Sequence, residues 1–441
     1  MNNTLKTMLI AASALTAVSS FAQDKSTLDL LVKKGVITAE ERAATLEESS
    51  NARAASGINR VFPKEDATKR LTIGGYFQAQ FQNFASSYNG SDLPGQQAFI
   101  MRRLYLEILA DVGEGISGNV VLDMSGNTSS SASSYLDRAM LSLTGEYGTV
   151  DLGYKKVTWG YEETTLSSLF KASSSKLLTV ERGITNRYWN EAENAKGRLG
   201  FGAHHVGLFY NSVINPQGFE YGVAVTNANR DFTSAGKGQN DLAVYANLVY
   251  NYKVSDSEKY AVGVNYGKSQ FFDVATTANT AATVEGYNPF VQVQYFNWTV
   301  MGEYLSTKIN DTVAGHTPTG YNATVVYKIN DNWEAVARYT SLDSDGRGIN
   351  INSVERDYEV NRTSNTGTSK LFNTSDAYYL GVNYYFTLSA LGSSVYGPNA
   401  KIQFGYEKAK FKDTLSAING SLTAGNKADV DAIRLQAQVA F

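Results

Sequence analysis

The last ten residues of the chain, 432–441, alternate between two kinds of side chain at a period of two. One face carries Ile433, Leu435, Ala437, Val439 and Phe441, and the other carries Arg434, Gln436, Gln438 and Ala440. Successive side chains of a β-strand point to opposite faces, so this segment is predicted to be a strand. A strand with one lipid-compatible face and a final aromatic residue is typical of the closing strand of an outer-membrane barrel, although an ordinary edge strand is the alternative. Likeness to such strands implies that Phe441 belongs to the signal read by the barrel-insertion machinery.

The composition favours strands and disfavours membrane helices. The 441 residues include 28 tyrosines and 20 phenylalanines, but only 6 prolines and no cysteine. Mean hydropathy is -0.27, and no apolar run after the N-terminus approaches the ~20 residues that a membrane helix requires. Only helices and closed barrels satisfy the backbone in lipid, so a membrane-spanning chain of this kind must be a barrel.

The N-terminus has the pattern of an export signal. Lys6 gives a positive start, residues 8–18 are apolar, and Ser20-Phe21-Ala22 is a small-x-small cleavage site. We predict a signal peptide over residues 1–22, cleaved after Ala22. Export of a chain without cysteine is compatible with an oxidising periplasm.

Residues 23–69 differ from everything that follows them. Gly35 is a plausible helix stop, and Thr38 with Glu41 forms a capping box. The pattern predicts a short periplasmic helical hairpin and a linker over 23–69, with the barrel over 70–441. The hairpin is either a solvated spacer or an element for oligomerisation or cell-wall contact.

From residue 71 onward, short alternating segments are separated by turns. We predict sixteen strands: 71–81, 99–110, 116–124, 136–144, 147–155, 198–213, 219–227, 241–252, 258–269, 284–296, 298–309, 318–329, 333–343, 375–386, 399–411 and 429–441. Short connections alternate with long ones, which include 82–98, 412–428 and the longest, 156–197. This asymmetry is typical of bacterial barrels. The fold class is therefore all-β, an antiparallel transmembrane barrel of about sixteen strands, with fourteen or eighteen as alternatives.

Alternation also predicts which side chains face inward. Val150, Leu152 and Tyr154 share one face, and the polar face opposite them carries Asp151 and Lys155. A barrel of this size with a polar interior encloses a water-filled lumen, which indicates a pore. The same alternation directs Arg103 inward, whereas Arg102 falls on the lipid side and would fit only near the extracellular rim.

Four short motifs resemble one known family. They are I-M-R-R-L-Y-L-E at 100–107, G-Y-K-K-V-T-W-G-Y-E-E-T-T at 153–165, E-R-G at 181–183 and the closing L-Q-A-Q-V-A-F. Their order and spacing resemble the phosphate-selective porin O and P family, with Thr158 where the family pattern has proline.

The resemblance implies a function and a set of residues. Arg102 and Arg103 match the paired arginines of the family, and Lys155, Lys156 and Arg182 match basic positions before and within the third long loop. The resemblance implies an outer-membrane porin whose third loop folds into the lumen. It also implies a homotrimer that contacts the outer-membrane lipid. It would pass small solutes by passive diffusion and prefer anions such as phosphate. A general non-selective porin and a structural or adhesive barrel are the alternatives.

An enzyme is not expected. Of the three histidines, His204 and His205 are adjacent, so on a strand they would point to opposite faces. There is no cysteine and no His-x-x-x-His spacing for a metal, and no Gly-rich phosphate loop. We therefore predict no cofactor, no metal and no nucleic-acid partner.

Overall fold

The structure is a computed structural model, and it describes part of the chain. The described residues are 32–34, 38, 70–125, 135–162, 201–202, 204–228, 242–272, 281–310, 315–346, 348–350, 371–388, 400–415 and 422–440. The chain divides into two compact units, Met1–Lys69 and Arg70–Phe441. The predicted signal peptide, Phe441 and nearly all of the predicted helical hairpin lie outside the described residues, so the domain boundaries stay predictions.

The second unit is a single sheet of eighteen antiparallel strands. In chain order they are β1 (Arg70–Tyr88), β2 (Ser91–Gly113), β3 (Ile116–Asp123), β4 (Leu136–Gly145), β5 (Gly148–Lys156), β6 (His204–Ser212), β7 (Phe219–Asn227), β8 (Leu242–Lys253), β9 (Glu258–Phe272), β10 (Ala281–Tyr295), β11 (Trp298–Asn310), β12 (Gly315–His316), β13 (Thr319–Lys328), β14 (Trp333–Asp343), β15 (Ile349–Asn350), β16 (Leu371–Phe386), β17 (Ala400–Leu415) and β18 (Leu422–Ala440). Two of these, β12 and β15, contain only two residues and extend the pairing of β11 and β16. The other sixteen form the wall, which confirms the predicted number.

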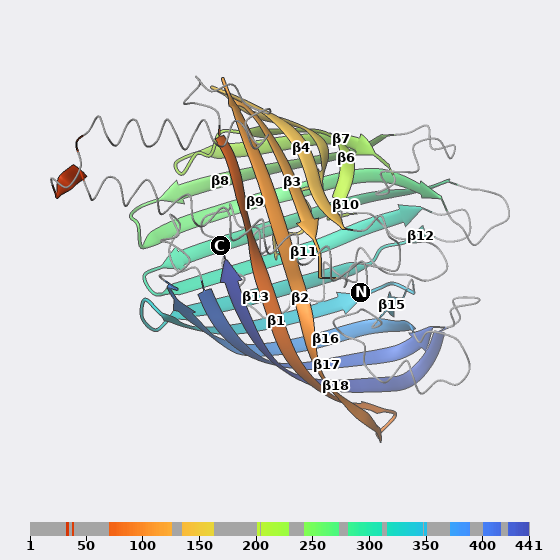
Figure 1. The fold of residues 1–441 in the computed structure, drawn as a ribbon. Helices are drawn as coiled ribbons and strands as arrows, with labels where there is room; N and C mark the ends of the chain where they lie inside the picture. Colours follow the sequence, from red (N-terminus) through yellow and green to blue (C-terminus); the bar gives the residue numbers. More distant parts are fainter. Residues whose placement is uncertain are drawn as a thin grey trace, which may run out of the picture. The chain divides into compact units, whose positions relative to one another are not determined.

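The sheet closes on itself. β1 pairs with β2 on one side and with β18 on the other, so the first and last strands are neighbours (Figure 1). Tyr76 is paired with Ala440 near the end of the chain. A closed ladder leaves no strand edge, which is the condition for a sheet to span lipid.

The outer surface is apolar and the inner surface is polar. On β9, the outward-facing Val262 and Val264 are exposed, whereas the inward-facing Asn265 is buried. The outward faces of β9–β14 carry aromatic residues toward both ends of the strands: Tyr260, Tyr266, Tyr287, Tyr295, Trp298, Tyr304, Tyr321, Tyr327, Trp333 and Tyr339. Two such rows match the aromatic girdles at the two membrane interfaces. No helix among the described residues is long and apolar enough to cross a membrane.

Two predicted long connections are wrong. Residues 82–98 belong to β1 and β2, which continue until Tyr88 pairs with Ser91 across a two-residue turn. The turn residues Asn89 and Gly90 have φ values of 49° and 82°, as a type I′ turn requires. The Asn-Gly pair indicates a hairpin turn, but the polar residues around it do not alternate with apolar ones as in a membrane-spanning strand. For the same reason most of 412–428 is strand, in β17 and β18.

The predicted strand 198–213 is shorter in the structure. The described strand begins at His204, and Phe201 and Gly202 before it form a turn. The segment forms one strand and not two, so the wall has an even number of strands and short connections alternate with long ones.

Candidate functional site

A β-bulge brings two arginines to the inner face of β2. Gln78 pairs with Arg103 and the next residue, Ala79, pairs with Met101, so Arg102 is the extra residue in the ladder. One extra residue reverses the facing of everything beyond it. Arg102 and Arg103 are 6% and 4% exposed, whereas Met101 faces outward at 39%. The expectation that Arg102 points toward lipid is wrong, because strict alternation does not allow for an extra residue in one strand.

Side-chain amides follow Arg103 along the inner surface. Arg103 Nη1 donates a hydrogen bond of 2.8 Å to Gln78 Oε1, and Gln78 Nε2 donates one of 2.6 Å to Gln438 Oε1. Farther along the same inner surface, Gln436 donates to Gln403, which donates to Asn383. Because the Gln78 amide is neutral, this contact orients the Arg103 guanidinium without cancelling its charge.

Lys155 faces inward as predicted, but it forms an ion pair. Its Nζ lies 2.5 Å from Asp151 Oδ2, and Ser142 Oγ donates to the other oxygen of that carboxylate at 2.6 Å. The ammonium also lies over the Phe209 ring, 5.1 Å from its centroid. Lys155 and Asp151 are four residues apart on one strand, so they share a face. The pair makes this part of the wall locally neutral.

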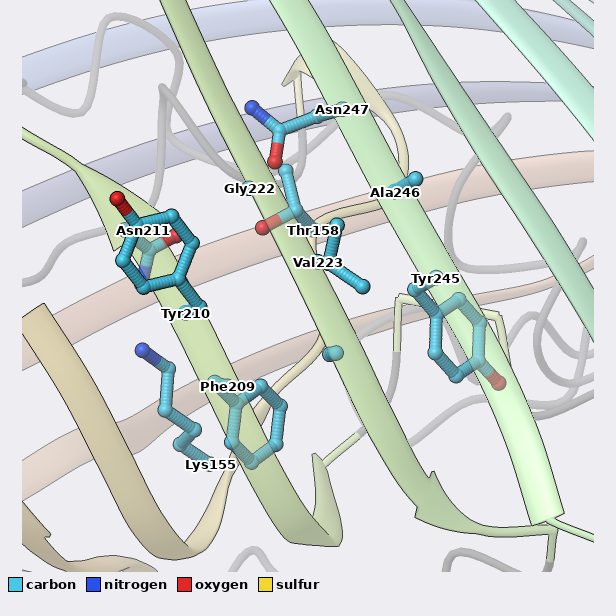
Figure 2. Close-up of a pocket in the computed structure, with 11 residues that line it drawn as sticks. Lys155, Thr158, Phe209, Tyr210, Asn211, Gly222, Val223, Tyr245, Ala246 and Asn247 are labelled. Carbon is cyan, nitrogen blue, oxygen red and sulfur yellow. The ribbon is translucent and has the colours of Figure 1, made fainter.

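A small pocket, with a volume of about 10 Å³, lies beside Lys155 (Figure 2). Its polar lining includes Thr158 and the amides of Asn211 and Asn247, and its apolar lining includes Phe209. The pocket is therefore bounded by β5, β6, β7 and β8 and by the first residues after β5.

The other predicted basic residues are not gathered at one point. Lys156 ends β5, where it pairs with His204, and alternation directs it to the face opposite Lys155. Arg182 lies outside the described residues. Since β3 and β4 separate β5 from β2, the structure brings Arg102 and Arg103 together but does not bring Lys155 beside them.

Residues 157–162, the cross-lumen strap, leave β5 and reach the far side of the barrel. The backbone N–H of Tyr161 donates to Glu303 Oε2 of β11 at 2.6 Å. The Tyr161 ring stacks on Phe290 of β10, with the centroids 4.2 Å apart and the planes at 13°. The neighbours of β5 in the wall are β4 and β6, so these contacts require the strap to cross the interior. The expectation that the third long loop enters the lumen is confirmed for 157–162, and residues 163–200 lie outside the described residues.

Two charged wall residues hold the end of the strap. Glu303 also accepts the N–H of Glu162 at 3.2 Å and the side-chain amide of Asn288 at 3.0 Å. Arg338 Nη1 of β14 donates to Glu162 Oε1 at 2.7 Å, and both of these side chains are 2% exposed. Sequence reasoning missed Glu303 and Arg338, because a charged residue on a polar strand face does not reveal a partner more than a hundred residues away.

The middle of the strap is held by aromatic packing. Trp159 is fully buried and meets the Phe201 ring edge-on at 4.7 Å. Phe201 in turn meets Tyr245 at 5.6 Å. A Cβ on Gly286 of β10 would lie 2.6 Å from Trp159, so glycine at this position lets the indole approach the wall closely.

A closed sixteen-stranded barrel with an apolar outside, a polar inside and a strap through its lumen is a porin of the bacterial outer membrane. The family model described as phosphate-selective porin O and P matches residues 71–441, and the chain belongs to that family. Members of this class are channels and not enzymes. No curated protein matches the chain.

Solved outer-membrane proteins share the fold at low sequence identity. The chain is similar to OmpT of Vibrio cholerae, with 12% identity, a TM-score of 0.50, and coverage of 86% of this chain and 99% of that one. The outer-membrane channel DcaP of Acinetobacter baumannii gives 12% identity, a TM-score of 0.51 and the same coverage. OprB of Pseudomonas putida gives 11% identity and a TM-score of 0.51, covering 83% of this chain and 94% of that one. At such identities the likeness concerns the fold alone.

Proposed function

We propose that this porin passes small solutes by passive diffusion and prefers anions, phosphate among them. The observation that carries the proposal is the bulge, which turns both Arg102 and Arg103 to the inner face. Fixed positive charge in a narrow pore replaces part of the hydration of an anion and repels cations. A guanidinium can in addition bind phosphate through two parallel hydrogen bonds.

Three inward cations contribute little to such a preference, because a carboxylate pairs with each of them. Lys155 pairs with Asp151, Arg338 with Glu162, and Arg434 with Glu407. An opposite charge at this distance cancels most of the field that a permeating ion would feel. Lys156 and Arg182 remain proposed members of the basic set, on the strength of the family resemblance.

The proposal is tested by the double substitution Arg102→Gln/Arg103→Gln. In an asymmetric KCl gradient its reversal potential should move toward cation preference. The control is Lys410→Gln, which removes a cation from the exposed outer face of β17 and should leave the reversal potential unchanged. A double variant with wild-type reversal potential would favour the general, non-selective porin.

We also propose a homotrimer, assembled through the wall formed by β2, β3 and β4. The outward Val120, Leu141 and Leu143 of this wall are exposed, and neither β3 nor β4 contains an aromatic residue. Aromatic residues mark walls that meet the lipid interfaces, so their absence favours contact with protein. Leu141→Trp should dissociate the trimer in cross-linking experiments, whereas Val262→Trp on the lipid-facing β9 should not. Equal trimer yield in both variants would contradict this assignment.

The chain ends complete the proposal. Cleavage after Ala22 would release a mature protein with a periplasmic segment before the barrel. The last strand, through Phe441, would be read by the barrel-insertion machinery.

A further inference from the structure

We propose that Glu303 and Arg338 are positioning residues that fasten the cross-lumen strap to the opposite wall and thereby set the width of the channel. The inference rests on the porin function, which the family establishes, and is independent of the proposed anion preference. It concerns the strap itself, residues 157–162.

Glu303 binds the strap through its backbone. Its two carboxylate oxygens accept hydrogen bonds from consecutive N–H groups, those of Tyr161 and Glu162. Asn288 donates to the same carboxylate, and Asn265 donates to Asn288 at 2.7 Å, so three strands fix the acceptor. Hydrogen bonds to a carboxylate are shorter and stronger than those between neutral groups. The strap is thus held at a defined point on β11.

Arg338 binds the strap through a side chain. Its guanidinium pairs with Glu162 and lies over the Tyr379 ring, 5.1 Å from the centroid. Both partners are almost fully buried, and an ion left unpaired in such a place carries a large desolvation penalty. Loss of Arg338 would therefore weaken the attachment of Glu162, and with it the strap, to the wall.

A second ion pair in the barrel provides a matched comparison. Arg434 of β18 pairs with Glu407 of β17 at 2.8 Å, both are 1% exposed or less, and Arg434 lies 5.2 Å from the Phe84 ring. Chemistry, burial and aromatic contact therefore resemble those of Arg338. The two ion pairs differ in the elements that they connect. Arg434 and Glu407 join two adjacent strands of the wall, whereas Arg338 joins the wall to the strap.

The test is single-channel conductance in planar bilayers, with heat-modifiable gel migration as the check that each barrel is folded. Glu303→Gln and Arg338→Met should each raise conductance, on the order of twofold, because a released strap widens the narrow part that sets the resistance. The two variants change the lumen charge in opposite directions, so a rise in both cannot arise from charge. The charge exchange Glu162→Arg/Arg338→Glu should restore the wild-type value.

The control is Arg434→Met/Glu407→Gln, which should keep wild-type conductance. If a strap variant fails to fold, Gly286→Ala displaces Trp159 sterically without altering any charge, and it should also raise conductance. Folded strap variants with wild-type conductance, or an equal rise in the control, would overturn the inference. The anion proposal is tested separately, by the reversal potentials of the wild-type channel and of Arg102→Gln/Arg103→Gln, so its failure would be distinguishable from a failure of the strap inference.

Discussion

Two sides of the lumen use charged residues in different ways. On β2, the Arg103 guanidinium donates to the neutral Gln78 amide, a contact that does not cancel its charge. On β11 and β14, Glu303 and Arg338 make their contacts with the strap, so their charges act on the protein. A basic residue in the lumen therefore indicates anion selectivity only when the groups that contact it do not neutralise its charge. Counting inward lysines and arginines does not separate the two cases.

The largest expected effect is on the free energy of unfolding, when arginine is replaced by methionine on each side of the lumen. Arg338→Met breaks the buried ion pair with Glu162, and should lower the free energy of unfolding by about 3–5 kcal/mol. Arg103→Met removes the hydrogen bond from a charged group to the Gln78 amide, a loss of about 1.5–3 kcal/mol. Urea unfolding in lipid vesicles, followed by tryptophan fluorescence, measures both. Equal losses would mean that the two arginines are held in the same way.

A smaller effect on stability is expected from deleting Arg102. The deletion joins Met101 to Arg103, which removes the bulge and gives β1 and β2 a continuous ladder. The barrel should therefore fold with nearly wild-type stability, while its reversal potential moves part of the way toward that of the double glutamine variant. Loss of folding would show instead that the bulge is required to close the barrel.

The sequence predicted the barrel well because alternation is a local property. Each strand needs one lipid-compatible face, so the pattern of residues such as Val262 and Val264 follows from the membrane alone. It predicted the sixteen strands and the inward direction of Arg103 and Lys155. Its errors lie where local alternation ends, at the Asn89-Gly90 hairpin and at the bulge that carries Arg102.

The strap shows the limit of reading a site from sequence. Glu162 and Arg338 are 176 positions apart, and Tyr161 and Glu303 are 142 apart. Their contact depends on how far the chain travels across the lumen, which no spacing within one segment encodes. Lys155 and Glu162 could be found from the family motif at 153–165. The motif did not indicate that Asp151 pairs with Lys155 or that Arg338 pairs with Glu162.

The reversal potential of the wild-type channel tests the proposed function most directly. With KCl more concentrated on one side of a planar bilayer, the arginine pair on β2 predicts a potential of the sign that chloride permeation produces. Added phosphate should reduce the chloride current, because guanidinium groups hold phosphate more strongly than chloride. A potential with the sign of potassium permeation at neutral pH would contradict the account and leave a general porin.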